Sequence, residues 1–409
     1  MKKSMPFLLV AYTIITIIVR SPVLLITPRF WAEEGLQYFA YAYKHSFMEN
    51  LFKQFYGYYT LIPNVSASLA TCIPLEYAPL LTTCIAILIQ VLVCCVIIVG
   101  KSFYWDNTLK KLYVITMLLL LSPAETWAQT IHSMFWLSFG TLFILLERTE
   151  GIDTHLKWFY RFILGISGLT GVVSCFMAPI YYIKSYRSKS KEDYLHSLIL
   201  SFCLLLQTIC FTAAVVSHNS TLSGRFSSEG CGLPPNLLRF FVWPFIGEVR
   251  NSGFDNSTNT ALNIIVLILF IIYFLFALFN GCKIHTIQYI AATFAIVVIL
   301  SVALSVKSTP LPTGDRYTLL PSYCLFMLIY HSALNKLRFM YFRYASVILL
   351  SIIAVHTIHN YRSSMASFTD PTWPVWKDEV MIWKNNHTHE IRIWPQWDGG
   401  RWTVKLHGK

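Results

Sequence analysis

Apolar runs long enough to span a bilayer recur between residues 7 and 360, and this feature limits the possible folds most strongly. A soluble domain carries about one charged residue in four, whereas only 13% of this 409-residue chain is charged. The runs alternate with short basic loops, as in helical membrane proteins, because a membrane β-barrel would show alternating segments of about ten residues. The sequence therefore predicts an all-α polytopic membrane protein.

Positive charges gather at the ends of the apolar runs and indicate the orientation of the chain. They include Lys2, Lys3, Lys110, Lys111 and the segments 184–191 and 336–343. The net charge of +12 is therefore explained by cytoplasmic loops that follow the positive-inside rule, and no basic stripe with interleaved aromatic residues indicates nucleic acid. Lys2 and Lys3 place the N-terminus inside. No small-residue cleavage site follows the first apolar run, which predicts a retained helix.

The charge rule arranges the apolar runs as nine spans. They are expected at about 6–25, 78–99, 109–122, 131–147, 195–216, 261–280, 287–306, 317–334 and 344–360. Residues 59–76 contain Pro63 and Pro74 and are expected on the membrane surface, because a crossing there would move Lys101 and the lysines at 110 and 111 outside.

Residues 159–184 have basic residues at both ends and glycine and serine in the middle, which predicts a re-entrant hairpin of two half-helices. The transmembrane domain is then 1–360, with outer loops at 26–58 and 218–260. An outer tail, 361–409, contains six of the twelve tryptophans and is expected to form a small α+β unit. It should have a short helix at 371–385 and two strands at 389–406, and Trp394, Trp397 and Trp402 could pack in its core or face a saccharide.

The first candidate site is the pair Glu33 and Glu34 in the first outer loop. Adjacent carboxylates near apolar surface can have one pKa raised, and such a group can serve as a general base. The alternative is a solvated loop with two inert acids. The surrounding aromatic residues, Trp31 and Tyr38 among them, are equally suited to anchor the interface or to stack on a sugar.

Two further groups of polar residues lie at predicted outer ends of spans. Arg316 lies between Asp315 and Tyr317, with Lys307 at the end of the preceding span, and an arginine there can hold a phosphate. It could equally pair with Asp315 or contact lipid headgroups. In the stretch 122–136, Glu125, Gln129 and His132 have helical spacing and are expected to share one face, beside Trp127. A structural role for His132 is the plainer alternative.

Several kinds of chemistry have no signal in this sequence. No glycine-rich nucleotide loop, Ser–His–Asp arrangement or zinc-ligand spacing occurs. Almost all of the ten cysteines lie inside apolar runs, so no disulfide framework is indicated. A soluble nucleotide-sugar or ATP is therefore an unexpected substrate.

The chain resembles the GT-C glycosyltransferases, which use polyprenyl-phosphate sugars. The resemblance is carried by the acidic pair after the first span, the hairpin at 159–184 and the outer turn Gly-Asp-Arg-Tyr at 314–317. The phrase FWAEEG…GYYTLIPN also resembles the Trp-Ala-Glu-Asp-Gly opening of bacterial GT-C proteins, although Glu34 stands where these often have aspartate. The layout, from 1 to 409, looks most like the phage-encoded serotype-converting glucosyltransferases that modify bacterial O-antigen.

This resemblance implies a function at the periplasmic face of the bacterial inner membrane, with a periplasmic C-terminal tail. The donor would be undecaprenyl-phosphate glucose, supplied by a synthase and a flippase, and the acceptor a sugar of the lipid-linked O-antigen. Glu33 or Glu34 would be the base of a single inverting displacement, with no metal or other cofactor. Donor phosphate would be held by Arg316, Lys307 and Arg29. Sugars would contact Trp31, Tyr38, Glu125, Trp127, His132, Asp315 and Tyr317.

Two other functions remain open at this point. A flippase or other transporter of lipid-linked sugars would have broken helices at related positions in both halves, whereas the sequence shows one such hairpin. An O-antigen acyltransferase would need a histidine-centred site facing an inner acyl donor, whereas the candidate residues are predicted to face outward.

Overall fold

The computed structural model describes residues 4–217, 285–305, 315–334, 340–396 and 402–406, and four single positions between 268 and 275. In these residues the chain is mostly helical, with one two-stranded sheet. Three of the described helical segments are long and apolar enough to cross a membrane: Leu75–Val99, Lys191–Val216 and Met340–Asn360. This agrees with the predicted helical membrane protein. The predicted outer loop 218–260 and most of the span 261–280 lie outside the described residues.

Helices occur at the other predicted spans that the structure describes. These are α1 (Met5–Arg20), α7 (Thr108–Leu121), α8 (Ser133–Leu146), α17 (His285–Ser305) and α18 (Leu319–Leu334). The predicted extent of the first span, to residue 25, is wrong. Helix α1 ends at Arg20, and the turn α2 (Val23–Ile26) follows Pro22, because proline has no N–H to continue the helical hydrogen bonds. The number of membrane crossings stays a prediction.

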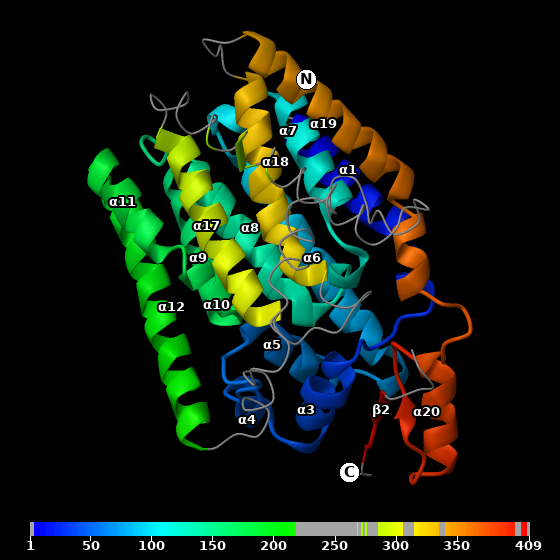
Figure 1. The fold of residues 1–409 in the computed structure, drawn as a ribbon. Coiled ribbons are helices and arrows are strands. Elements are labelled where there is room, and N and C mark those ends of the chain that lie inside the picture. Colours follow the sequence, from blue (N-terminus) through cyan, green and yellow to red (C-terminus); the bar gives the residue numbers. More distant parts are fainter. Residues whose placement is uncertain are drawn as a thin grey trace.

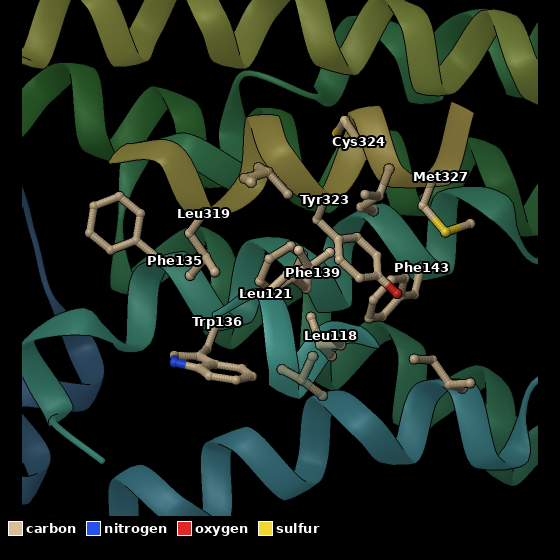
Figure 2. Packing of buried hydrophobic residues seen from close by; sticks show 14 of the residues in the cluster. Leu118, Leu121, Phe135, Trp136, Phe139, Phe143, Leu319, Tyr323, Cys324 and Met327 are labelled. Atoms are coloured by element: carbon tan, nitrogen blue, oxygen red, sulfur yellow. The ribbon is translucent and has the colours of Figure 1, made fainter. Parts of the chain in front are cut away.

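The core lies between α7, α8 and α18, with α6 (Ala78–Val99) against α8. Figure 2 shows aromatic side chains of α8 facing Tyr323 of α18 across this interior. The ring of Tyr323 lies 5.1 Å from Phe139 and 5.6 Å from Phe143, and its hydroxyl donates to the Val114 carbonyl oxygen at 3.2 Å. The buried phenol therefore packs as an apolar residue while its one polar group is satisfied.

The predicted hairpin region contains a helix break. Helix α9 (Thr154–Thr170) ends before Gly171, and α10 (Val172–Cys175) and α11 (Ala178–Ser188) follow. A Cβ on Gly168 would lie 2.5 Å from the Cβ of Cys203, and one on Gly171 would lie 2.7 Å from the Cβ of Met134. These glycines therefore let α9 approach α12 (Lys191–Val216) and α8 closely. That the broken segment re-enters the membrane stays a prediction.

The predicted outer elements lie together at the C-terminal end of the molecule, away from the N-terminus (Figure 1). They are the π-helix η1 (Glu34–Phe39), α3 (Ala40–Lys44), α4 (Phe47–Leu51), α5 (Leu61–Ala70), α20 (Trp376–Asn385), β1 (Ile391–Arg392) and β2 (Thr403–Val404). Helix α5 has 10 residues and is about 15 Å long, half of a bilayer core. That residues 59–76 lie on the membrane surface stays a prediction.

The tail contains the short helix and the two strands that the sequence predicts. The strands are antiparallel, with Ile391 opposite Val404. Glu379 of α20 binds β1, since it accepts from Arg392 Nε at 2.9 Å and from the Arg392 N–H at 3.0 Å, and it also pairs with His389 at 2.9 Å. Burial acts to raise the pKa of Glu379, but these donors hold it below its usual value. The predicted turn at Gly399 and Gly400 lies outside the described residues.

The tail shares its core with the first outer loop. This core consists of Phe30, Phe39, Ala70, Ala78, Trp376, Val380, Trp383, Ile391, Ile393, Val404 and Leu406. Residues 30 and 39 flank the acidic pair, so the tail packs directly against the segment that carries it.

Candidate active site

The acidic pair lies in a sharp turn that separates the two carboxylates. Ala32 has φ of 43°, a left-handed conformation that is uncommon for residues other than glycine. Its N–H donates to the carbonyl oxygen of Trp394 at 2.5 Å, and the N–H of Trp394 donates to the carbonyl oxygen of Phe30 at 3.2 Å. Glu33 then precedes the π-helix that begins with Glu34. The two neighbouring acids therefore have different surroundings.

Glu34 is buried, with 3% of its surface exposed. It accepts hydrogen bonds from the Thr130 N–H at 3.0 Å, from the Thr130 hydroxyl and from the Trp31 N–H at 3.3 Å. Burial raises the pKa of Glu34, against the opposing effects of Thr130 and of the positive charge of Arg29. Both carboxylate oxygens are engaged within the protein, so a substrate hydroxyl has little access to this acid.

Glu33 is half-buried, and its side chain makes no hydrogen bond or ion pair with any residue that the structure describes. It lies within electrostatic range of Arg316, whose nearest acidic partner is Glu125. A general base must reach the proton that it removes. Of the two acids, Glu33 is therefore the one whose carboxylate a ligand can reach.

Arg316 forms an ion pair with Glu125, which is distant in sequence. The Arg316 N–H donates to Glu125 Oε2 at 3.0 Å, and Nη1 of the guanidinium pairs with Oε1. The Glu125 side chain is 2% exposed, whereas that of Arg316 is 28% exposed. The buried acid thus fixes a guanidinium that a ligand can still approach. Lys307 and the side chain of Asp315 lie outside the described part of the chain.

An apolar hollow borders Arg316. It is shallow, with an interior space of about 10 Å³, about the room that one water molecule needs. It is lined by Arg316 and by Phe135, Val173, Val297, Leu300, Tyr317, Leu320 and Pro321. In Figure 2, Phe135 lies at one end of the packed interior. Leu319, which precedes the lining residue Leu320 in the sequence, lies at the same end. The hollow is too small to enclose a ligand, so a ligand with an anionic head and a hydrocarbon part would lie across its open side, with the head at Arg316.

The segment from Glu125 to His132 is not one helix, so the prediction of a shared helical face is wrong. The 3-10 turns Ala124–Thr126 and Thr130–His132 are separated by Ala128, whose φ is 51°. His132 still meets Glu125, because it lies against the backbone of Glu125 and within the electric fields of Glu125, Arg316 and Arg29.

Four buried polar atoms beside this segment have no hydrogen-bond partner among the described residues. They are Arg29 Nε, Gln129 Oε1, His132 Nδ1 and Ser133 Oγ. Arg29 donates from Nη1 to the Ala128 carbonyl oxygen at 3.4 Å, and burial lowers its pKa to about 10, against the effect of Glu34. Unsatisfied buried groups are costly and are found at functional sites. Sequence reasoning missed Ser133, because one small polar residue in an apolar run carries no signal of its own.

Most aromatic residues expected to contact sugars are packed inside the protein. Trp31 stacks on Phe368 at 5.6 Å, and the buried hydroxyl of Tyr38 accepts from Thr60 at 3.2 Å. Trp127 lies under Arg20, at 4.2 Å from the guanidinium carbon, and is 1% exposed. Trp394 is buried as well, and Trp397 lies outside the described residues. Tyr317 is half-buried, and its ring lies 5.0 Å from the Arg316 guanidinium carbon. It is the predicted aromatic contact that stays reachable at this site.

No group of three histidine, cysteine or acidic side chains suited to a metal ion occurs in the described ranges. Comparison with protein-family models, with curated proteins and with solved structures finds no match for the chain. Function is therefore inferred from the residues and geometry of this chain.

Replacement of Glu34 by alanine is expected to destabilise the protein. It would leave the buried N–H groups of Thr130 and Trp31 without their acceptor, which costs about 1–3 kcal/mol of the free energy of unfolding. Unfolding of the purified protein in detergent measures the effect. Glu33→Ala is the matched control and should unfold near the wild-type midpoint, because Glu33 makes no hydrogen bond among the described residues. Equal midpoints for both variants would contradict the structural role of Glu34.

The same acid gives this stability a pH dependence. Burial raises the folded-state pKa of Glu34 above 4.5, so the folded protein binds this proton more tightly than the unfolded chain does. The stabilisation is complete below about pH 4.5 and is lost as the pH rises through the folded-state pKa. Glu34→Gln should remove this part of the slope when stability is measured between about pH 4.5 and about pH 8.

Proposed function

We propose that the chain is a GT-C-type, polyprenyl-phosphate-sugar-dependent glycosyltransferase. It transfers glucose from undecaprenyl-phosphate glucose to a sugar of the lipid-linked O-antigen. One observation carries the proposal: the Glu33 side chain, free of hydrogen bonds among the described residues, lies within electrostatic range of Arg316, and Arg316 borders an apolar hollow. A reachable base and a cation for an amphiphilic phosphate are the two groups that this reaction requires.

The reaction is a single displacement at the anomeric carbon of glucose. The acceptor hydroxyl attacks that carbon and gives its proton to Glu33, while the bond from the carbon to the phosphate oxygen breaks. Arg316 stabilises the charge that develops on the departing polyprenyl phosphate. The proposal also assigns Lys307, which lies outside the described residues, to the same phosphate. The polyprenyl chain lies against the apolar side chains that border Arg316, outside the small hollow itself. Attack opposite to the leaving group inverts the anomeric centre.

The buried residues around these groups hold the site in place. Glu34 organises Thr130 and Trp31, Arg29 balances the charge of Glu34, and Glu125 fixes Arg316. His132 and Gln129 have buried polar atoms without a partner among the described residues, and these could bind the hydroxyl groups of a sugar only if the site opens to admit it. The site belongs on the periplasmic side of a bacterial inner membrane, with the N-terminus in the cytoplasm and the C-terminus in the periplasm.

Expression in an O-antigen-bearing host, together with a polyprenyl-phosphate-glucose synthase and its flippase, tests this function. We expect one additional hexose per modified repeat, detected by mass spectrometry of the purified polysaccharide. Omission of the synthase is the control and should abolish the addition. Intact O-antigen without added hexose would refute the proposal, an added acyl group would indicate an acyltransferase, and a change in lipid-linked sugar distribution alone would indicate a transporter.

A further inference from the structure

We infer that the C-terminal tail positions the catalytic base, and that Trp394 is the positioning residue through which it acts. The main chain of the tail at Ile393 and Trp394 holds the turn from Trp31 to Glu34 and thereby sets the place of Glu33. The catalytic part of this inference rests on the proposed function, whereas the structural part does not.

The first support is the main-chain pairing between two segments from opposite ends of the chain. Trp31 and Trp394 form a parallel bridge, in which Ala32 donates to the Trp394 carbonyl oxygen at 2.5 Å and Trp394 donates to the Phe30 carbonyl oxygen at 3.2 Å. Ala32 has a φ of 43°, and a strained backbone conformation of this kind persists only where contacts with the surrounding structure enforce it. The tail supplies that constraint.

The second support is the way in which the Trp394 side chain is anchored. Its Nε1 donates to the Pro374 carbonyl oxygen at 2.8 Å, and its ring lies 5.2 Å from that of Trp373. The guanidinium carbon of Arg29 lies 5.9 Å from the Trp394 ring and 5.8 Å from the Trp31 ring. The side chain therefore fixes the end of the tail strand and borders the arginine that neutralises Glu34.

The third support is the close packing between loop and tail. A Cβ on Gly35 would lie 2.8 Å from Ile393 Cδ1 and 2.8 Å from the Phe30 Cβ, so no space remains between them. The ring of Phe30 also meets that of Trp376 edge-on at 4.9 Å. A displacement of the tail strand must therefore move the turn with it.

This coupling reaches the base because Glu33 has no anchor of its own among the described residues. The position of its carboxylate is set by the backbone on either side. On one side Trp394 holds Ala32, and on the other side Thr130 holds Glu34. A small displacement of a catalytic group can lower the rate about 100-fold. The binding of the donor phosphate depends on Arg316, which is held by Glu125 instead.

The test compares Trp394→Ala, Trp394→Phe and Trp383→Ala in the full-length protein. Trp383 is a matched control, because it is a buried tryptophan of the same tail core that donates to the Leu406 carbonyl oxygen, and in the described part of the chain it has no hydrogen bond to the turn. Measurements are kcat and KM for polyprenyl-phosphate glucose, and hydrogen–deuterium exchange of a peptide covering residues 28–38. For Trp394→Ala we expect kcat to fall about 10- to 100-fold, KM to change less than about twofold, and the amide of Ala32 to exchange faster.

Trp394→Phe retains the ring contact and should recover most of kcat, and Trp383→Ala should keep both kcat and the protection of Ala32. Unchanged kcat in Trp394→Ala would overturn the inference, as would an equal loss in Trp383→Ala, which would show general support of folding by the tail. If the wild-type chain transfers no hexose, the proposed function fails by itself. Unaltered exchange of the Ala32 amide in Trp394→Ala would then still overturn the structural part.

Discussion

Replacement of Glu33 by glutamine is expected to lower the rate of glucose transfer at least about 100-fold, because a positioned general base contributes about 10²- to 10⁴-fold. Glutamine keeps the size of the side chain but cannot take the proton of the acceptor hydroxyl. Among the described residues no hydrogen bond is lost, so the amount and the unfolding midpoint of the protein should not change. Initial rates with purified protein, polyprenyl-phosphate glucose and lipid-linked acceptor measure the effect.

The neighbouring acid provides the control for this assignment. Glu34→Gln should lower the rate less than about tenfold, because the amide oxygen of the new side chain can still accept from Thr130, and only the longer bond from the Trp31 N–H is lost. Glu33→Asp should retain a measurable rate, since the carboxylate remains but withdraws by one methylene. Loss of transfer in Glu34→Gln together with activity in Glu33→Gln would reverse the assignment and make Glu34 the base.

The sequence predicts the long helices well, because their limits depend on local signals. The span expected at 78–99 corresponds to α6, which begins at Ala78 before Pro79 and ends at Val99 before Gly100. Proline in the first turn and glycine after the last are signals that a single sequence contains. The tail helix and the paired strands have similarly local patterns. The end of α1 was predicted less well, since the apolar run continues past Pro22 and conceals the break.

The partners of the site residues could not be predicted, because they come from distant parts of the chain. Arg316 was expected to meet Asp315 or a phosphate, and the structure pairs it with Glu125. Glu33 and Glu34 are equivalent in the sequence, and only tertiary packing buries one and leaves the other reachable. The left-handed Ala32 and Ala128 carry no signal either, since alanine ordinarily favours helix.

The burial of the aromatic residues could not be predicted from the sequence either. Their position near the predicted membrane surface suggested sugar platforms, yet Trp31 and Trp127 are buried by Phe368 and Arg20. A tryptophan offers a large apolar surface, and composition does not show whether protein or ligand covers it. Around the acidic turn, residues 368–394 of the tail cover much of the aromatic surface.

Replacement of Arg316 by alanine is expected to reduce glucose transfer at least about 100-fold, because a cation at the developing phosphate charge is worth about 10²- to 10³-fold. Arg316→Lys should recover part of the rate, since lysine keeps the charge without the planar fork of donors. The kinetic effect should appear mainly in kcat, because the charge on the phosphate increases as the sugar departs.

Arg316→Ala alone has a second effect, because it leaves Glu125 buried without its partner. Loss of one member of a buried pair costs up to about 3–5 kcal/mol, less here because Arg316 is partly exposed. The double variant Arg316→Ala/Glu125→Gln separates the two effects. We expect it to recover the unfolding midpoint of the wild-type protein, since no uncompensated charge is buried, while its transfer rate stays at the level of Arg316→Ala. Recovery of transfer in the double variant would show instead that Arg316 serves to neutralise Glu125, and another cation would have to receive the leaving phosphate.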